Sequence, residues 1–373
     1  MTAPVEARFY EALPDGRVRC TLCPHHCRML DGTLGACGVR VNHSGTLYTL
    51  VYDRVAATHL DPIEKKPLFH FLPGTMAYSF STVGCCLRCS FCQNWGISQW
   101  PMEHLPRRVA WQHPGQPAVC VEFQTLQDAV AGVPMTPERI VHSALASGAS
   151  SIAYTYVEPT VFFELACDTA ALAKRQGLRN VFITCGYTCE PPLRELAKLM
   201  DAVNVDLKFF REESYRHISR GRLQPILDAI RLYRELGVWT EVTTLVIPGV
   251  NDSDDELLGI ANFIRNISPD IPWHVSRFVP AYRMLDRPST PLETLTRACR
   301  LGRELGLRYV YSGNVPGEGG EDTACAECGA TLIVRHGYQV RSNRIRNGRC
   351  PTCQTRIPGV GMSGGHPGSS RMF

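Results

Sequence analysis

Between residues 76 and 313 the chain alternates short apolar runs with longer segments in which apolar positions recur every three or four residues. The short runs are rich in Val, Ile, Tyr and Thr, as β-strands are, and the longer segments have the period of amphipathic α-helices. A helical pattern stands between each predicted strand and the next. The predicted strands are MAYSFSTVG, SSIAYTY, NVFITCG, AVNVDLK, TEVTTLVIPG, WHVSRFV and RYVYSG.

Repeated strand–helix units build a parallel sheet covered by helices. Because about seven strands fall short of a closed eight-stranded barrel, we expect an α/β fold, a partial (β/α) barrel, over residues 71–317. Functional side chains would gather at the carboxyl ends of its strands. We expect cysteine-rich modules at 1–70 and 318–360, a flexible tail at 361–373, and a long connection at 101–135.

Composition adds little to this picture until the cysteines are considered. The 373 residues are 44% hydrophobic and 20% charged, and a net charge of +4 is too small to indicate a nucleic-acid or membrane-surface binder. No signal peptide or membrane span is recognisable, so we expect a cytoplasmic protein without a membrane partner. Disulfides are rare there, and twelve of the seventeen cysteines fall into three short clusters, which indicates metal or iron–sulfur binding.

The middle cluster follows the first predicted strand, at the expected barrel mouth. Within STVGCCLRCSFCQNWG, Cys85, Cys89 and Cys92 have the spacing C-x3-C-x2-C. Closely spaced thiolates of this kind surround compact iron–sulfur cubanes, and three of them leave one iron open for a substrate. Cys86 is off the spacing, and we expect it to be a packed thiol. The alternatives are a zinc site completed by a distant residue, or structural thiols.

This spacing on the first loop of a partial barrel resembles the radical SAM superfamily. With CTLCPHHCRMLDGTLGACGVR, DPIEKKPLFHFLPG, CSFCQNWGISQ, AYTYVEPT, VNVDLKFF, VIPGVND, WHVSRF and YSGNVPG, the chain resembles more narrowly the AmmeMemoRadiSam-system radical SAM enzymes, which are relatives of glycyl-radical-enzyme activating enzymes. The resemblance extends from about residue 20 to the C-terminal cysteines.

The resemblance implies a [4Fe-4S] cluster on Cys85, Cys89 and Cys92, S-adenosylmethionine (SAM), and an electron donor such as flavodoxin or ferredoxin. It implies SAM cleavage to a 5′-deoxyadenosyl radical, which abstracts hydrogen from a substrate. We expect that substrate to be an unidentified small molecule or cofactor precursor. One alternative is an activase that places a radical on a partner protein. Another is a non-catalytic zinc protein that binds nucleic acid through its basic end.

The resemblance also implies SAM-binding roles for residues at other strand ends. Glu158 stands where relatives have a Gly-Gly-Glu stretch that meets the methionine amino group, although the two glycines are missing. We expect its carboxylate to point from the barrel rim, with a surface cap as the alternative. Asp206 and Lys208 share a strand face and are expected at the SAM site, unless they form a plain ion pair. His274 is expected near the adenosine unless it is structural, and Asn251 is expected beside the nucleoside.

The C-terminal cluster predicts a zinc ribbon, because its two C-x2-C pairs are separated by 21 residues. The predicted zinc ligands are Cys325, Cys328, Cys350 and Cys353. From Cys328 onward the chain contains seven Arg and no Asp or Glu. We expect a solvated basic face there, with an anionic partner as the alternative.

The N-terminal cluster also closes a four-ligand site, with the spacing C-x2-C-x3-C-x9-C. Its ligands are Cys20, Cys23, Cys27 and Cys37. Thiolates suit both zinc and an auxiliary iron–sulfur cluster, so ligand type leaves both open, with zinc slightly preferred. Cys185 and Cys189 are expected to be buried thiols.

Overall fold

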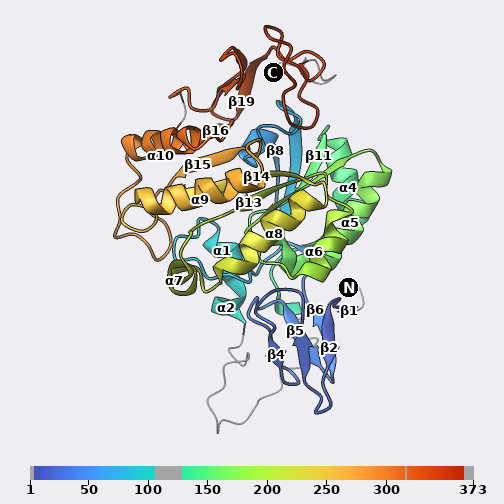
Figure 1. Cartoon of the computed structure of the whole chain (residues 1–373). Coiled ribbons are helices and arrows are strands. Elements are labelled where there is room, and N and C mark those ends of the chain that lie inside the picture. The colour runs from blue at the N-terminus through green and yellow to red at the C-terminus, as the bar shows by residue number, and fades with distance from the viewer. Residues whose placement is uncertain (1–3, 106–127, 316, 365–373) are drawn as a thin grey trace.

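The computed structural model describes residues 4–105, 128–315 and 317–364, and its centre is an eight-stranded sheet with the order β16-β15-β14-β13-β12-β11-β9-β8 (Figure 1). Seven of these strands are mutually parallel, as the sequence predicts. They are β9 (Met76–Ser81), β11 (Ser151–Tyr154), β12 (Arg179–Thr184), β13 (Ala202–Asp206), β14 (Trp239–Val246), β15 (Trp273–Arg277) and β16 (Val310–Gly313). The partial (β/α) barrel is thereby confirmed.

The eighth strand, β8 (Ala57–Pro62), pairs antiparallel with β9 and was not predicted. It lies within the first expected module, yet it belongs to the large sheet. Its sequence, ATHLDP, has little apolar alternation, and its exposed His59 and Leu60 show that it is an edge strand.

Within the described residues, one helix of eight or more residues stands between each parallel strand and the next. These helices are α4 (Pro137–Ala146), α5 (Phe163–Arg175), α6 (Glu190–Ala197), α8 (Leu223–Glu235), α9 (Asp254–Ile267) and α10 (Leu292–Glu304). They bury their apolar faces on the sheet, and the side chains of Thr136 and Ser253 cap the first turns of α4 and α9. Shorter turns are η1 (Ile63–Lys65), α1 (Trp95–Ser98), α2 (Trp100–His104), η2 (Pro159–Phe162), α7 (Glu212–Ser214) and η3 (Tyr215–Ser219).

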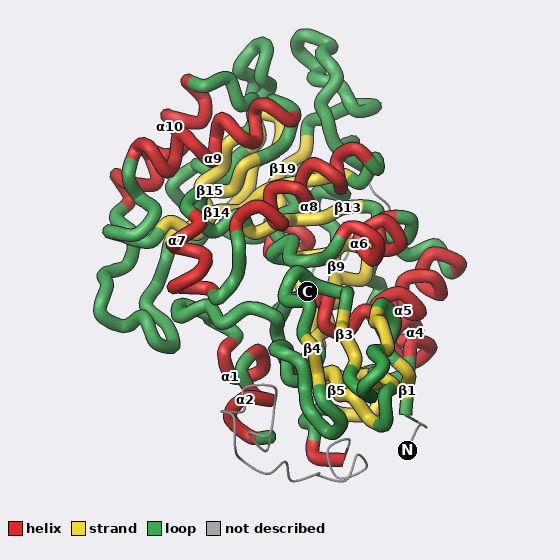
Figure 2. Tube along the Cα trace, turned by 60° about the horizontal axis from the view of Figure 1, so that its bottom comes forward, coloured by secondary structure: helices red, strands yellow, loops and turns green. Residues whose placement is uncertain are grey.

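The N-terminal module consists of two small antiparallel sheets. One contains β2 (Tyr10–Ala12), β3 (Val18–Cys20) and β4 (Arg28–Met29), and the other contains β1 (Val5–Glu6), β6 (Thr46–Thr49) and β5 (Arg40–His43). Figure 2 shows these strands together at one end of the molecule, and Gly38 approaches Pro101 of α2. The strands β7 (Arg54–Val55) and β10 (Val133–Pro134) form a further antiparallel pair. This pair joins the segment before β8 to the segment just before α4. The module therefore packs at the carboxyl end of β9.

The C-terminal module lies at the opposite end of the barrel (Figure 1). Its strands are β17 (Thr323–Ala324), β18 (Thr331–His336) and β19 (Gln339–Asn343). Arg335 is fully buried, donates to the carbonyl of Phe69 at 2.9 Å, and lies 3.5 Å from the Glu64 carboxylate. Phe71 and Val360 form a further backbone bridge. The ribbon is thus fastened to the barrel by buried contacts.

Two expected segments fall partly outside the described residues. The connection predicted at 101–135 includes 106–127, and the tail predicted at 361–373 includes 365–373. Met362, inside that expected tail, is buried in the ribbon core. Among the helices that the structure describes, none is long and apolar enough to span a bilayer.

Candidate functional site

Cys85, Cys89 and Cys92 occupy the loop between β9 and α1, directly after the carboxyl end of the first parallel strand. Cys89 is buried and the other two are half-buried. Each sulfur has a polar neighbour: Leu87 N at 3.5 Å from Cys85, Ser219 Oγ at 3.2 Å from Cys89, and Ser98 Oγ at 3.3 Å from Cys92. Burial raises the pKa of the Cys89 thiol to about 12.

The spacing of the three loop sulfurs differs from that of ligands around one zinc ion. Sulfurs bound to tetrahedral zinc at about 2.3 Å lie about 3.8 Å from one another. Within 4–105, 128–315 and 317–364, the C-terminal cysteines are the one set of three or more ligand atoms that all lie within 4.8 Å of one another. The three loop sulfurs do not all meet this limit, so they are not arranged as ligands of one zinc ion.

Gly84 lets the N-terminal module approach this loop. Its φ of 94° is in the left-handed region, and a Cβ there would lie 2.6 Å from Val39 Cγ1 and 2.9 Å from the Cys37 carbonyl oxygen. A side chain would therefore separate the two segments, and glycine keeps them in contact.

Asp206 and Lys208 lie beside the cysteine loop, and they form the ion pair that was the alternative to a SAM-binding role. Asp206 ends β13, and Lys208 Nζ donates to its carboxylate at 2.7 Å. The Lys208 amine also lies 5.9 Å from the ring centre of Phe91, which belongs to the cysteine loop. Burial lowers the pKa of Lys208, but the negative charges of Asp206 and Cys89 raise it well above its usual value on balance. The loop thus faces a protonated amine.

Glu158 differs from the expectation that its carboxylate points out from the barrel rim. It is 3% exposed, and both of its oxygens accept hydrogen bonds. The donors are Thr160 N and Oγ1, Thr184 Oγ1, Cys185 N and Cys185 Sγ, at 2.6–3.1 Å. These donors turn the carboxylate inward. The pKa of Cys85 is lowered to about 7, chiefly by Cys86, with a further contribution from the N–H of Leu87, whereas the negative charge of Glu158 opposes this change.

Asn251 is buried and uses its side chain on the backbone. Its amide donates to the carbonyls of Lys208 at 2.7 Å and Leu245 at 2.8 Å, and its oxygen accepts from Ile247 N at 2.6 Å. These bonds position the segment that carries Lys208, whereas a direct contact with a nucleoside was expected.

His274 belongs to a different group of buried side chains. Its Nε2 lies 2.7 Å from Glu241 Oε2, and its ring stacks on Tyr311. Glu241 also accepts from the backbone N–H groups of Phe69 and His70, which lie beside the C-terminal ribbon. These contacts are those of a structural histidine, which was the alternative to a position near the adenosine. They do not join His274 to the cysteine loop.

Cys86 connects two parts of the molecule that the sequence treats separately. It is buried, as expected, and it lines one cavity together with Cys23 of the N-terminal module. Cys185 is buried as expected, and Cys189 is half-buried, with its sulfur 3.9 Å from His26 Nε2. Nothing in the one-dimensional spacing links Cys23 to Cys86, so sequence reasoning could not find this shared cavity.

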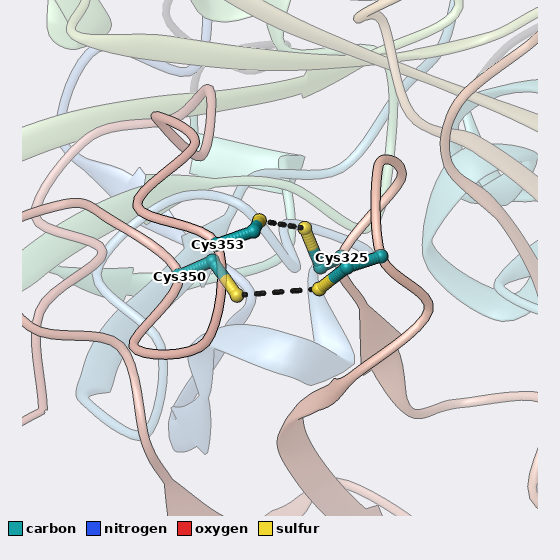
Figure 3. Close-up of side chains that lie close together, drawn as sticks. Cys325, Cys350 and Cys353 are labelled. Carbon is teal, nitrogen blue, oxygen red and sulfur yellow. Dashed lines mark hydrogen bonds between the residues drawn. The ribbon is translucent and has the colours of Figure 1, made fainter.

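The C-terminal cysteines form a compact metal-binding geometry (Figure 3). The Cys325 and Cys353 sulfurs are 3.6 Å apart, and the Cys328 and Cys350 sulfurs are 3.7 Å apart. The Thr355 hydroxyl and N–H lower the pKa of Cys353 to about 6, which favours its thiolate.

Comparison with known proteins agrees with this arrangement. Residues 79–261, which include the cysteine loop, match the model of the Radical SAM superfamily. The chain belongs to this superfamily. It is 42% identical to the uncharacterized protein MJ0808 of Methanocaldococcus jannaschii, over 94% of this chain and 98% of that one.

Other radical SAM relatives are more distant. The pyruvate formate-lyase-activating enzyme of Clostridium pasteurianum is 23% identical over 49% of this chain and 67% of its own length. Among solved structures, a radical SAM methyltransferase from Sphaerobacter thermophilus aligns with a TM-score of 0.45 and 18% identity, over 73% of this chain and 72% of that one. Radical SAM proteins are enzymes that use a [4Fe-4S] cluster and SAM, and the superfamily includes activators of glycyl-radical enzymes.

Proposed function

We propose that this protein reductively cleaves SAM at a [4Fe-4S] cluster held by Cys85, Cys89 and Cys92, and abstracts hydrogen from a small molecule or cofactor precursor. The observation that carries the proposal is the placement of three thiols, with the spacing C-x3-C-x2-C, at the end of the first parallel strand and beside the Lys208–Asp206 ion pair. When bound, the cluster and SAM supply a 5′-deoxyadenosyl radical.

The chain's own residues bind and orient SAM in this proposal. Lys208, protonated and held by Asp206, attracts the methionine carboxylate. Asn251 fixes the backbone that carries Lys208, and the inward carboxylate of Glu158 stiffens the two strand ends beside the loop. Buried Leu87 and Phe91 exclude water from the cluster. His274 remains a candidate for the adenosine end only if the buried group around it rearranges.

The other components of the proposal follow from the same chemistry. A flavodoxin or ferredoxin supplies single electrons, and the reduced thiols favour the cytoplasm. Zinc occupies the C-terminal ribbon, because the two measured sulfur separations agree with the about 3.8 Å expected around that ion.

A second candidate is an activase that places the radical on a glycine of a partner protein. The match to pyruvate formate-lyase-activating enzyme favours it. An electron paramagnetic resonance (EPR) doublet of a glycine radical on a partner protein, formed together with 5′-deoxyadenosine, would select this candidate.

The proposal is tested by Cys89→Ala in anoxically purified protein. With dithionite as reductant, 5′-deoxyadenosine formation should fall to background because the cluster loses a ligand, while zinc in the ribbon should be unchanged. Cys299→Ala removes an equally buried thiol on α10 and should keep full activity. SAM cleavage that persists in Cys89→Ala would refute the assignment.

A further inference from the structure

The four N-terminal cysteines line one cavity between the N-terminal module and the barrel. β3 ends at Cys20, and the other three lie in the turns around β4 and before β5. The module also contributes Leu22, Met29, Gly35 and Arg40 to the wall, and the barrel contributes Cys86, Thr160 and Val161. The thiols therefore converge on a shared space at the mouth of the barrel.

Each of the four sulfurs faces a backbone N–H donor. The pairs are Leu22 with Cys20, His25 with Cys23, Ala36 with Cys27 and Val39 with Cys37. For Ala36 the nitrogen–sulfur distance is 3.3 Å. These N–H groups offset part of the cost that burial adds to the thiolate form, which is the form that binds metals.

Arg40 supplies a positive charge to the same cavity. It is 1% exposed, its Nη2 donates to Glu164 Oε1 at 2.5 Å, and its Nη1 donates to the Arg8 carbonyl at 2.9 Å. Its Nε is buried and has no hydrogen-bond partner within the described residues. A buried, unpartnered N–H on a guanidinium that lines a thiol cavity points to an anionic occupant.

The separation of the sulfurs decides between the two occupants that ligand type leaves open. The C-terminal set lies within 4.8 Å, as a single zinc ion requires, but within the described part of the chain no three of the N-terminal sulfurs do. A cubane holds its four thiolates farther apart than a single ion does. Either centre is anionic with four thiolates, so the sulfur separation distinguishes them and the charge does not. We propose that Cys20, Cys23, Cys27 and Cys37 ligate a second [4Fe-4S] cluster in place of the zinc preferred from the sequence.

This second cluster would stand next to the first one. Cys86 follows Cys85, a ligand of the loop cluster, directly in the chain and lines the cavity that the four N-terminal cysteines share. The two ligand sets therefore meet at this residue. The role that follows rests on the proposed function: the N-terminal cluster receives one electron from the flavodoxin-type or ferredoxin-type donor and passes it to the loop cluster, with no bond made or broken.

The inference is tested by counting metals in protein purified anoxically and without reconstitution. Wild-type protein should contain about eight iron atoms, about eight sulfides and about one zinc per chain. The triple variant C85A/C89A/C92A and the double variant C23A/C37A should each keep about four iron atoms and about one zinc. Cys299→Ala, the matched loss of a buried thiol away from both sites, should match wild type.

EPR of the reduced protein tests the proximity. The wild-type spectrum should be broadened or split relative to the sum of the spectra of the triple and double variants, because two nearby paramagnetic centres couple. SAM should shift the loop-cluster signal in the double variant and leave the signal of the triple variant unchanged.

Wild-type protein with about four iron atoms and about two zinc ions would overturn the inference whatever the variants do. Iron absent from a folded triple variant would overturn it as well. SAM cleavage by protein with about four iron atoms would leave the proposed function standing and remove this inference. Protein that contains two clusters but does not cleave SAM would leave this inference standing and remove the proposed function.

Discussion

Lys208 is the side chain whose proposed role can be tested most directly. Its ammonium group is 2.7 Å from the Asp206 carboxylate and 5.9 Å from the ring centre of Phe91 in the cysteine loop. The lysine side chain is 13% exposed and that of Asp206 is 40% exposed, so the pair is open to a ligand from one side. A carboxylate that enters there would gain a charge-assisted hydrogen bond.

Lys208→Met should therefore weaken SAM binding by about tenfold or more, which corresponds to the loss of one hydrogen bond to a charged group. The iron content should stay at the wild-type value because the cysteines are unchanged. Equilibrium dialysis with labelled SAM measures the affinity, and Lys174→Met on the outside of α5 is the control. Unchanged affinity in Lys208→Met would mean that the lysine is only the partner of Asp206.

At the scale of elements, the junction between β9 and the cysteine loop depends on one residue without a side chain. Gly84→Ala adds a methyl group against Val39 and the Cys37 carbonyl, in addition to the strain of a left-handed backbone. We expect it to lower the free energy of unfolding by about 2 kcal/mol or more, and to lower the iron content.

Gly148→Ala separates the two effects of the Gly84 substitution. Gly148 also has a left-handed φ, of 70°, but nothing lies within 4 Å of the added Cβ, so this variant shows backbone strain alone. Denaturant unfolding and iron analysis compare the two variants. Equal losses would show that the contact between the module and the loop contributes nothing.

The strands and helices were predictable from the sequence wherever the spacing of apolar residues kept one period along the whole strand or helix. All seven parallel strands and the six long helices were recognisable in this way, and the cysteine spacing located the loop. The edge strand β8 has no such period. The cavity that Cys86 and Cys23 share, the inward turn of Glu158 and the pairing of His274 with Glu241 arise from tertiary packing between distant segments, which no local pattern encodes.

At the scale of the whole molecule, the ribbon is attached to the barrel by a buried ion pair. The Glu64 carboxylate and the Arg335 guanidinium are both fully buried, and burial raises the pKa of Glu64 despite its arginine partner. Arg335 also donates to the carbonyls of Phe69 and Glu321. Arg335 was one of the seven arginines expected on a solvated basic face. It is instead buried, and its side chain holds the ribbon to the barrel.

Arg335→Met should destabilise the protein by about 3–5 kcal/mol, because it leaves a buried carboxylate without its charge partner. The double variant E64Q/R335M should recover part of the loss, since neither side chain then carries a charge. Arg341→Met on the exposed side of the ribbon is the control. Thermal unfolding measures all three variants, and a double variant less stable than Arg335→Met would contradict this account.

The two cysteine-rich modules stand at opposite ends of the barrel. By the assignments proposed above, the N-terminal module needs iron and the C-terminal module needs zinc. A cell that is short of iron but supplied with zinc would then make chains that hold zinc in the C-terminal ribbon and lack clusters at the mouth of the barrel. The zinc content of a preparation would then not report how much of the protein holds its clusters.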